Sequence, residues 1–131
     1  MGASHAILRG DMAGTGRFTK SDKLLARAQF DAVFARKQSV GDRRLTMFFA
    51  PNQAGHPRLG LVVSTVFGNA VKRNLFKRRL REIFRRHRGL LGAVDVIAMP
   101  ARHGESKSAG HAELEKSWLA LCVKASARGS N

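Results

Sequence analysis

The densest group of chemically active side chains lies between residues 72 and 88. Nine of these seventeen residues are lysine or arginine, and only Glu82 is acidic. Guanidinium and ammonium groups bind phosphate oxygens, so such a stretch indicates contact with a polyanion. A solvated basic face on a surface helix is the simpler alternative, but no acidic residues are interleaved at i+4 spacing to relieve the repulsion. The cations are Lys72, Arg73, Lys77, Arg78, Arg79, Arg81, Arg85, Arg86 and Arg88.

An amphipathic helix is the element expected to position these cations. Its apolar stripe, with the i, i+4, i+7, i+8 spacing of a core-facing surface, consists of Phe76, Leu80, Ile83 and Phe84. Asn69 is the predicted N-cap, because its side-chain oxygen can accept from a free backbone N–H of the first turn. Gly89 is the predicted C-terminal stop.

Side chains that could form a catalytic or metal site do not cluster in the sequence. The nine acidic residues are scattered, and Glu113 and Glu115 should face different ways on a helix. The five histidines form no i, i+4 pair, and no phosphate-binding glycine loop or nucleophile motif is present. Cys122, the single cysteine, suits a small buried position. The pattern favours a binding protein and predicts no catalytic residue and no metal ligand of its own.

Length and charge set the class of partner. The 131 residues suffice for one domain, and 24 Lys and Arg against nine Asp and Glu give a net charge of +15. That excess favours nucleic acid or an anionic membrane surface. No apolar run has the length of a membrane span, and the first residues lack the apolar core of a secretory signal. We therefore expect a cytoplasmic protein.

Helical and strand patterns alternate around the basic helix. Residues 26–37 predict a helix, and residues 43–50 and 58–64 predict two strands that most simply pair as an antiparallel hairpin. Residues 39–42 read as a turn. Residues 94–99 predict a third strand, which is followed by a last amphipathic helix over 112–125.

These elements predict a single small α+β domain. The order is helix, strand, strand, helix, strand, helix, a sandwich of helices on a sheet that leaves room for one more short strand. The domain is expected to span residues 18–125, between a flexible N-terminal arm, 1–17, and a flexible tail, 126–131.

Four of these patterns together resemble the bacterial ribonuclease P protein component. They are the F-x-x-V-F spacing that begins at Phe30, the R-L-G-L-V-V-S strand at 58–64, the K-R-N-L-F-K-R-R-L-R-E-I-F helix at 72–84, and the D-V-I-A-M strand. They follow one another in order over most of the chain. The basic-helix motif, together with the strand before it, is the specific part.

The resemblance implies a left-handed βαβ crossover and a division of labour. In this family the catalytic RNA subunit binds Mg²⁺ and hydrolyses precursor tRNA to form the mature 5′ end, while the protein docks on that RNA and holds the single-stranded 5′ leader. The expected cofactors are Mg²⁺, bound mainly by the RNA, and the catalytic RNA itself. The expected partners are ribonuclease P RNA and the 5′ leader of precursor tRNA, with no membrane and no DNA.

The resemblance also implies two RNA-binding surfaces. The surface for the catalytic RNA comprises Asn69, Lys72, Arg73, Asn74, Lys77, Arg78 and Arg81. The surface for the leader comprises Phe30, Phe34, Phe48, Ser64 and Arg102. Aromatic rings suit a leader of any sequence, because every base has a π-face. Helical spacing alone favours core packing for Phe30 and Phe34, whereas strand alternation points Phe48 away from Met47 and Phe49.

The chain departs from the family pattern at the ends of three motifs. The departures are Leu75, in place of the second arginine of the helix motif; Thr65 and Val66, in place of a basic pair after the second strand; and Ala101, which leaves Arg102 as the remainder of a basic pair after the last strand. We therefore expect looser leader binding, or compensation by Arg43, Arg44 or Arg58.

Two other functions share part of this pattern. A ribosomal or other structural RNA-binding protein would have the same size and charge and the same lack of catalytic groups. A DNA-binding module with residues 69–88 as its recognition helix fits less well, because a helix of Arg and Lys suits phosphates rather than the discrimination of base edges.

Overall fold

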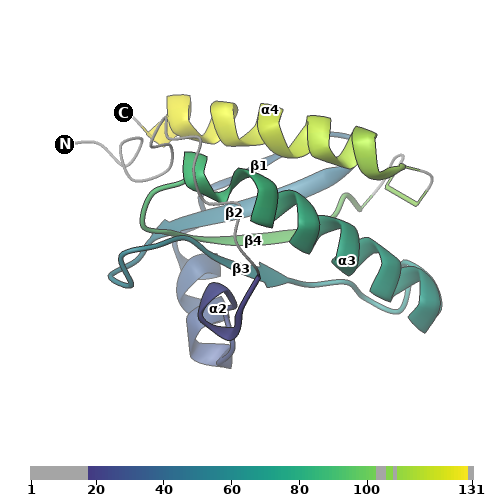
Figure 1. Cartoon of the computed structure of the whole chain (residues 1–131), viewed down its shortest axis with the longest axis horizontal. Helices are drawn as coiled ribbons and strands as arrows, with labels where there is room; N and C mark the ends of the chain where they lie inside the picture. Colours follow the sequence, from purple (N-terminus) through teal and green to yellow (C-terminus); the bar gives the residue numbers. More distant parts are fainter. Residues whose placement is uncertain (1–17, 103–105, 108, 130–131) are drawn as a thin grey trace.

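A mixed four-stranded sheet lies between two layers of helices. The computed structural model describes residues 18–102, 106–107 and 109–129; the predicted N-terminal arm lies outside them. Helices α3 and α4 cover one face of the sheet and α2 lies on the other face (Figure 1). The predicted α+β class is confirmed. In chain order the elements are η1 (Lys20–Asp22), α2 (Arg27–Ala35), β1 (Ser39–Gly41), β2 (Leu45–Pro51), β3 (Arg58–Leu61), α3 (Ala70–His87), η2 (Arg88–Leu90), β4 (Val94–Pro100) and α4 (His111–Gly129).

Strand β4 lies inside the sheet, whose order is β1-β2-β4-β3. It pairs antiparallel with β2 and parallel with β3. Its residues from Val94 to Ala98 are all buried, so β4 is covered on both faces and its backbone needs a partner at both edges. The predicted antiparallel hairpin of the second and third strands is therefore wrong, because β4 inserts between them. Because β3 and β4 run parallel, the chain needs a long connection between them, and α3 provides it as a βαβ crossover.

Strand alternation divides the apolar side chains into two clusters. Met47 and Phe49 point into the main core under α3 and α4, where Trp118 is almost completely buried. Phe48 points to the opposite face and joins a smaller cluster under α2. The prediction that Phe48 points away from its neighbours on the strand is confirmed.

Several element boundaries differ from the predicted ones. Residues 39–41, predicted as a turn, form the short edge strand β1, which Val40 anchors in the core. Gly89 does not stop the basic helix with a left-handed residue; the chain continues into the 3₁₀ turn η2, in which Gly89 is buried. Helix α4 continues to Gly129, so residues 126–129 are helical rather than part of a flexible tail. No helix in the described part of the chain is long and apolar enough to cross a membrane.

Candidate nucleic-acid interface

Helix α3 buries the predicted stripe and starts at the predicted cap. Its buried residues are Phe76, Leu80, Ile83 and Phe84. The Asn69 side chain accepts a hydrogen bond from the backbone N–H of Lys72 at 3.0 Å, which satisfies one donor of the first turn. The apolar stripe fixes how the helix is rotated against the sheet, and that rotation directs the cations outward.

The last turns of α3 are neutralised by acidic side chains. Glu82 binds Arg85 and lies 3.6 Å from Nε of Arg86. Glu115 of α4 contacts His87 at 2.6 Å, and Asp22 of η1 contacts Arg88. The expectation that no acid relieves the repulsion is wrong for this half of the helix, because one acid lies on α3 itself and two come from distant parts of the chain.

The first turns of α3 keep their positive charge. Within the described residues no carboxylate lies within 4.0 Å of the cationic groups of this half. Arg73 and Arg79 donate to the backbone carbonyls of Gly68 and Ala109, which leaves their charge in place. At 1.5 Å per residue the charged stretch is about 15 Å long. Its cations are Lys72, Arg73, Lys77, Arg78, Arg79 and Arg81.

The side chains predicted to contact the catalytic RNA therefore share this half of α3. Asn69, Lys72, Asn74, Arg78 and Arg81 are exposed. Arg73 and Lys77 are half-buried. Exposed cations without acidic neighbours produce the strongest local attraction for phosphate.

The predicted leader residues share the face of the sheet that carries α2. Phe48 pairs in register with Ile97 of β4, and Ile97 pairs with Gly60 of β3, so the three residues form one row across the sheet. The Phe34 ring of α2 meets the Phe48 ring edge to face, with ring centroids 4.9 Å apart. Both rings are half-buried, so part of each remains in contact with solvent.

Phe30 packs against the backbone of the same row. A Cβ on Gly60 would lie 2.6 Å from Cε2 and 2.8 Å from Cζ of the Phe30 ring. Only glycine admits a ring this close to the strand. The interpretation of Phe30 as a packing residue is thus supported, and its ring also contributes to the half-buried aromatic face.

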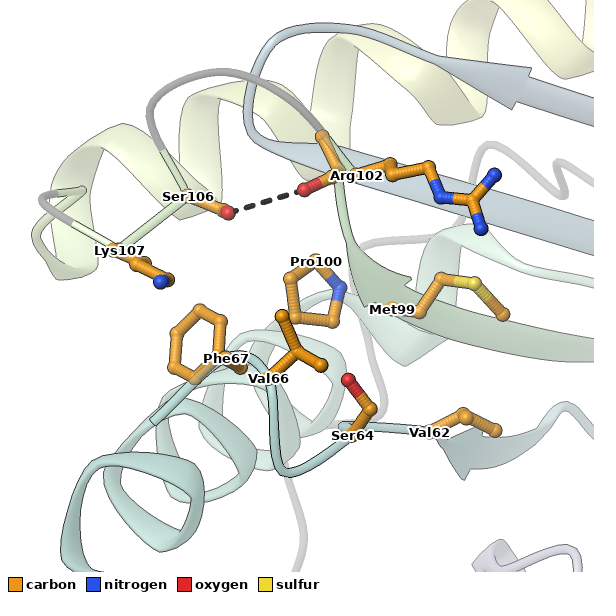
Figure 2. Close-up of a pocket in the computed structure, with 10 residues that line it drawn as sticks. Val62, Ser64, Val66, Phe67, Met99, Pro100, Arg102, Ser106 and Lys107 are labelled. Carbon is orange, nitrogen blue, oxygen red and sulfur yellow. Dashed lines mark hydrogen bonds between the residues drawn. The ribbon is translucent and has the colours of Figure 1, made fainter. Parts of the chain in front are cut away.

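Ser64 and Arg102 both line a groove at the end of this sheet face. The groove, here called the sheet-end groove, has a volume of about 660 Å³ (Figure 2). Its lining residues are Val62, Ser64, Val66, Phe67, Met99, Pro100, Ala101, Arg102, Ser106 and Lys107. Met99 and Val62 also line this groove, although neither was among the predicted leader residues. Strand alternation could have found them, since Val62 has the parity of Gly60 and Ser64, and Met99 the parity of Ile97.

Two of the arginines expected to compensate for missing cations are engaged in the fold. Both Arg58 Nε and Nη2 donate to the buried carboxylate of Asp95, at 2.8 and 2.9 Å, and these hydrogen bonds raise the pKa of Arg58. Arg44 donates to Ser117 and Glu113. These contacts count against compensation by Arg44 or Arg58, because either side chain would have to leave an ion pair to contact RNA.

Cys122, a possible nucleophile, is buried, and the acidic side chains that could ligate a metal ion are dispersed among the described residues. Burial raises the pKa of the Cys122 thiol to about 12, so the thiol is not a nucleophile at neutral pH. Glu113 and Glu115 face different partners, Arg44 and His87 respectively. Among the described residues no three His, Cys, Asp or Glu side chains gather closely enough to hold a metal ion. The arrangement offers phosphate-binding cations and base-stacking rings.

Comparison with known proteins assigns this arrangement to a family. The family model described as Ribonuclease P matches residues 18–126. The chain belongs to the ribonuclease P protein family. The ribonuclease P protein component of Thermotoga maritima is 35% identical over 89 residues, which are 67% of this chain and 76% of the relative. That of Streptococcus pneumoniae is 38% identical over 101 residues, which are 76% of this chain and 80% of the relative.

Solved ribonuclease P proteins share the fold. The Staphylococcus aureus RNase P protein superposes with a TM-score of 0.73 at 28% identity, over 86% of this chain and all of that protein. The Thermotoga maritima RNase P protein superposes with a TM-score of 0.70 at 30% identity, over 78% of this chain and 96% of that protein. Membership assigns this chain to tRNA 5′ processing as part of a ribonucleoprotein endoribonuclease.

Proposed function

We propose that this chain docks on a catalytic ribonuclease P RNA through the first half of α3 and holds the 5′ leader of precursor tRNA on the face that carries α2. The RNA subunit performs the hydrolysis that forms the mature tRNA 5′ end, in the cytoplasm, and no membrane or DNA takes part. The protein supplies binding and orientation.

The charge distribution along α3 carries this proposal. From Lys72 to Arg81 the cations have no acidic partner in the part of the chain that the structure describes, whereas the turns from Glu82 onward are paired. A helix that served only as a solvated surface would gain stability from pairing along its whole length. Unpaired arginine and lysine on one rigid element present a row of phosphate-binding groups to a folded RNA.

The proposal assigns Mg²⁺ to the RNA. Mg²⁺ prefers carboxylate and phosphate oxygens. The candidate interface of this chain presents guanidinium, ammonium and aromatic groups, which do not ligate Mg²⁺ and, where charged, repel it. The metal would therefore be held by RNA phosphates at the cleavage site.

Leader binding is supported by the aromatic face and the sheet-end groove together. The half-buried rings of Phe34 and Phe48 can stack with bases of any identity, and Arg102 lines the groove, where it can contact phosphates. Residues 62–69 connect this face to the start of α3, so the two surfaces adjoin.

Reconstitution with a bacterial ribonuclease P RNA tests the proposed function. At low Mg²⁺ concentration the protein should stimulate cleavage of precursor tRNA and should prefer that RNA to an unrelated transcript of equal length. A series of 5′ leaders should give affinity that rises over the first few nucleotides. If the protein fails to stimulate cleavage and binds both transcripts equally, it is a structural RNA-binding protein instead.

A further inference from the structure

A second groove runs along the flank of α3 that faces the start of α4. This helix-flank groove has a volume of about 360 Å³ and lies between the first half of α3 and residues 106–107 and 109–110. Its apolar lining includes Phe67, Leu75 and Phe76, and its cations are Lys72, Arg79 and Lys107. Among the described residues, none of those that line it is acidic. Arg79 holds the two walls together through its hydrogen bond to the Ala109 carbonyl, 3.2 Å long.

The lining combines two kinds of surface that suit different parts of one ligand. The Phe67 and Phe76 rings pack together with centroids 5.1 Å apart, and half-buried Leu75 extends this apolar surface into the groove. A phosphate alone would gain nothing from Leu75, and an apolar molecule would gain nothing from three cations. A nucleotide has a base whose flat faces stack on apolar side chains and a phosphate that binds cations, so it fits both parts of the lining.

The position of the groove decides which RNA would supply the nucleotide. Lys72 lines the groove and also belongs to the first half of α3, whose cations have no carboxylate partner among the described residues. Helix α2 lies on the opposite side of the sheet from α3 (Figure 1), and the aromatic side chains proposed for the leader cluster beneath α2. An RNA that lies along α3 therefore reaches this groove without crossing the sheet.

We propose that the helix-flank groove binds one unpaired, unstacked base of the catalytic RNA, with Leu75 and Phe67 against the base and Lys72, Arg79 and Lys107 toward its phosphates. This site rests on the proposed function, since it needs the catalytic RNA on α3. Phe67 and Lys107 also line the sheet-end groove, and Figure 2 shows both at one end of it, so the two grooves adjoin there.

Binding of a bacterial ribonuclease P RNA across a salt series tests the site. Leu75→Ala should lower affinity roughly five- to tenfold with an unchanged salt slope, because it removes apolar contact and no charge. Lys107→Ala should flatten the log–log slope by about 0.7–0.9, as one lost phosphate contact requires. Val71→Ala is the matched control, because Val71 is an exposed apolar residue of the same helix that lies outside the groove lining.

Nucleotide-resolution chemical probing of the same complexes identifies the base. One unpaired nucleotide should be protected by the wild-type protein and by Val71→Ala, and exposed with Leu75→Ala. Leu75→Met, which keeps the apolar contact, should retain the protection, and a thermal unfolding midpoint of Leu75→Ala equal to that of the wild type excludes a folding defect. The site is refuted if Leu75→Ala matches Val71→Ala within twofold in affinity and in probing while the wild type still stimulates cleavage. A wild-type protein that fails to stimulate cleavage refutes the proposed function itself.

Discussion

The Glu82–Arg85 ion pair marks the point on helix α3 where the basic side chains begin to have carboxylate partners. The Glu82 carboxylate accepts from both Nε and Nη2 of Arg85, and Arg86 lies within ion-pair distance of the same carboxylate. N-terminal to this pair, the cations of α3 have no carboxylate partner among the described residues; C-terminal to it, Glu115 and Asp22 continue the pairing. Phosphate binding should therefore depend on which half of the helix is altered.

Paired substitutions in the two halves of α3 should have unequal effects. Replacing Arg78 and Arg81 by Ala should flatten the log–log salt slope for catalytic RNA by roughly 1.4–1.8, since each lost phosphate contact contributes about 0.7–0.9. Replacing Arg85 and Arg86 by Ala removes the same formal charge and should change the slope much less, because Glu82 and Glu115 already pair with these side chains. Equal changes for the two double variants would show that only net charge matters.

Removal of the Glu82 charge should extend the binding surface. Hydrogen bonding from Arg85 lowers the pKa of Glu82, so the carboxylate is ionised at neutral pH and its pairing is lost only as pH falls through that lowered pKa. Glu82→Gln removes one carboxylate charge beside Arg85 and Arg86 and should steepen the salt slope for unrelated RNA by about one contact, or roughly 0.7–0.9. Glu113→Gln makes the same charge change beside Arg44, away from α3, and is the control. The idea fails if both variants steepen the slope alike.

Loss of the Phe48 ring should weaken leader binding without changing its salt dependence. Phe48→Leu keeps an apolar side chain beside Phe34 and removes the stacking surface, so we expect a cost of about 1 kcal/mol in binding precursor tRNA with a leader. Phe49→Leu is the matched control, since Phe49 is the next residue and points into the main core. Affinity for mature tRNA should be unchanged by either substitution, and a similar leader defect in both would argue against stacking.

A methyl group at Gly60 should displace the Phe30 ring. The new Cβ would lie 2.6 Å from the ring, so Gly60→Ala should lower the free energy of unfolding by about 1–3 kcal/mol. In a Phe30→Ala background the same substitution should cost much less, because the ring that it clashes with is gone. Urea unfolding of the four proteins measures this coupling, and additive costs would contradict the contact.

Local chemistry let the sequence predict individual elements and the direction of single side chains. The stripe of α3, its cap at Asn69 and the direction of Phe48 depend on periodicities within a few residues, and the structure confirms all three. The same local reasoning indicated a polyanion as the partner, because Lys and Arg on one helix attract phosphate wherever the helix packs. The strand and helix motifs resembled the same family that the comparison with known proteins shows.

Only the tertiary structure decided which strands pair and which cations stay unpaired. The insertion of β4 between β2 and β3 depends on competition among strand edges that no local window contains. Arg88 meets Asp22 from 66 residues away and His87 meets Glu115 from 28 residues away. The helix-flank groove likewise exists because residues 106–107 and 109–110 lie beside Leu75. Charges and grooves of this kind are set by contacts between distant segments, whereas helices and strand faces are set by neighbours along the chain.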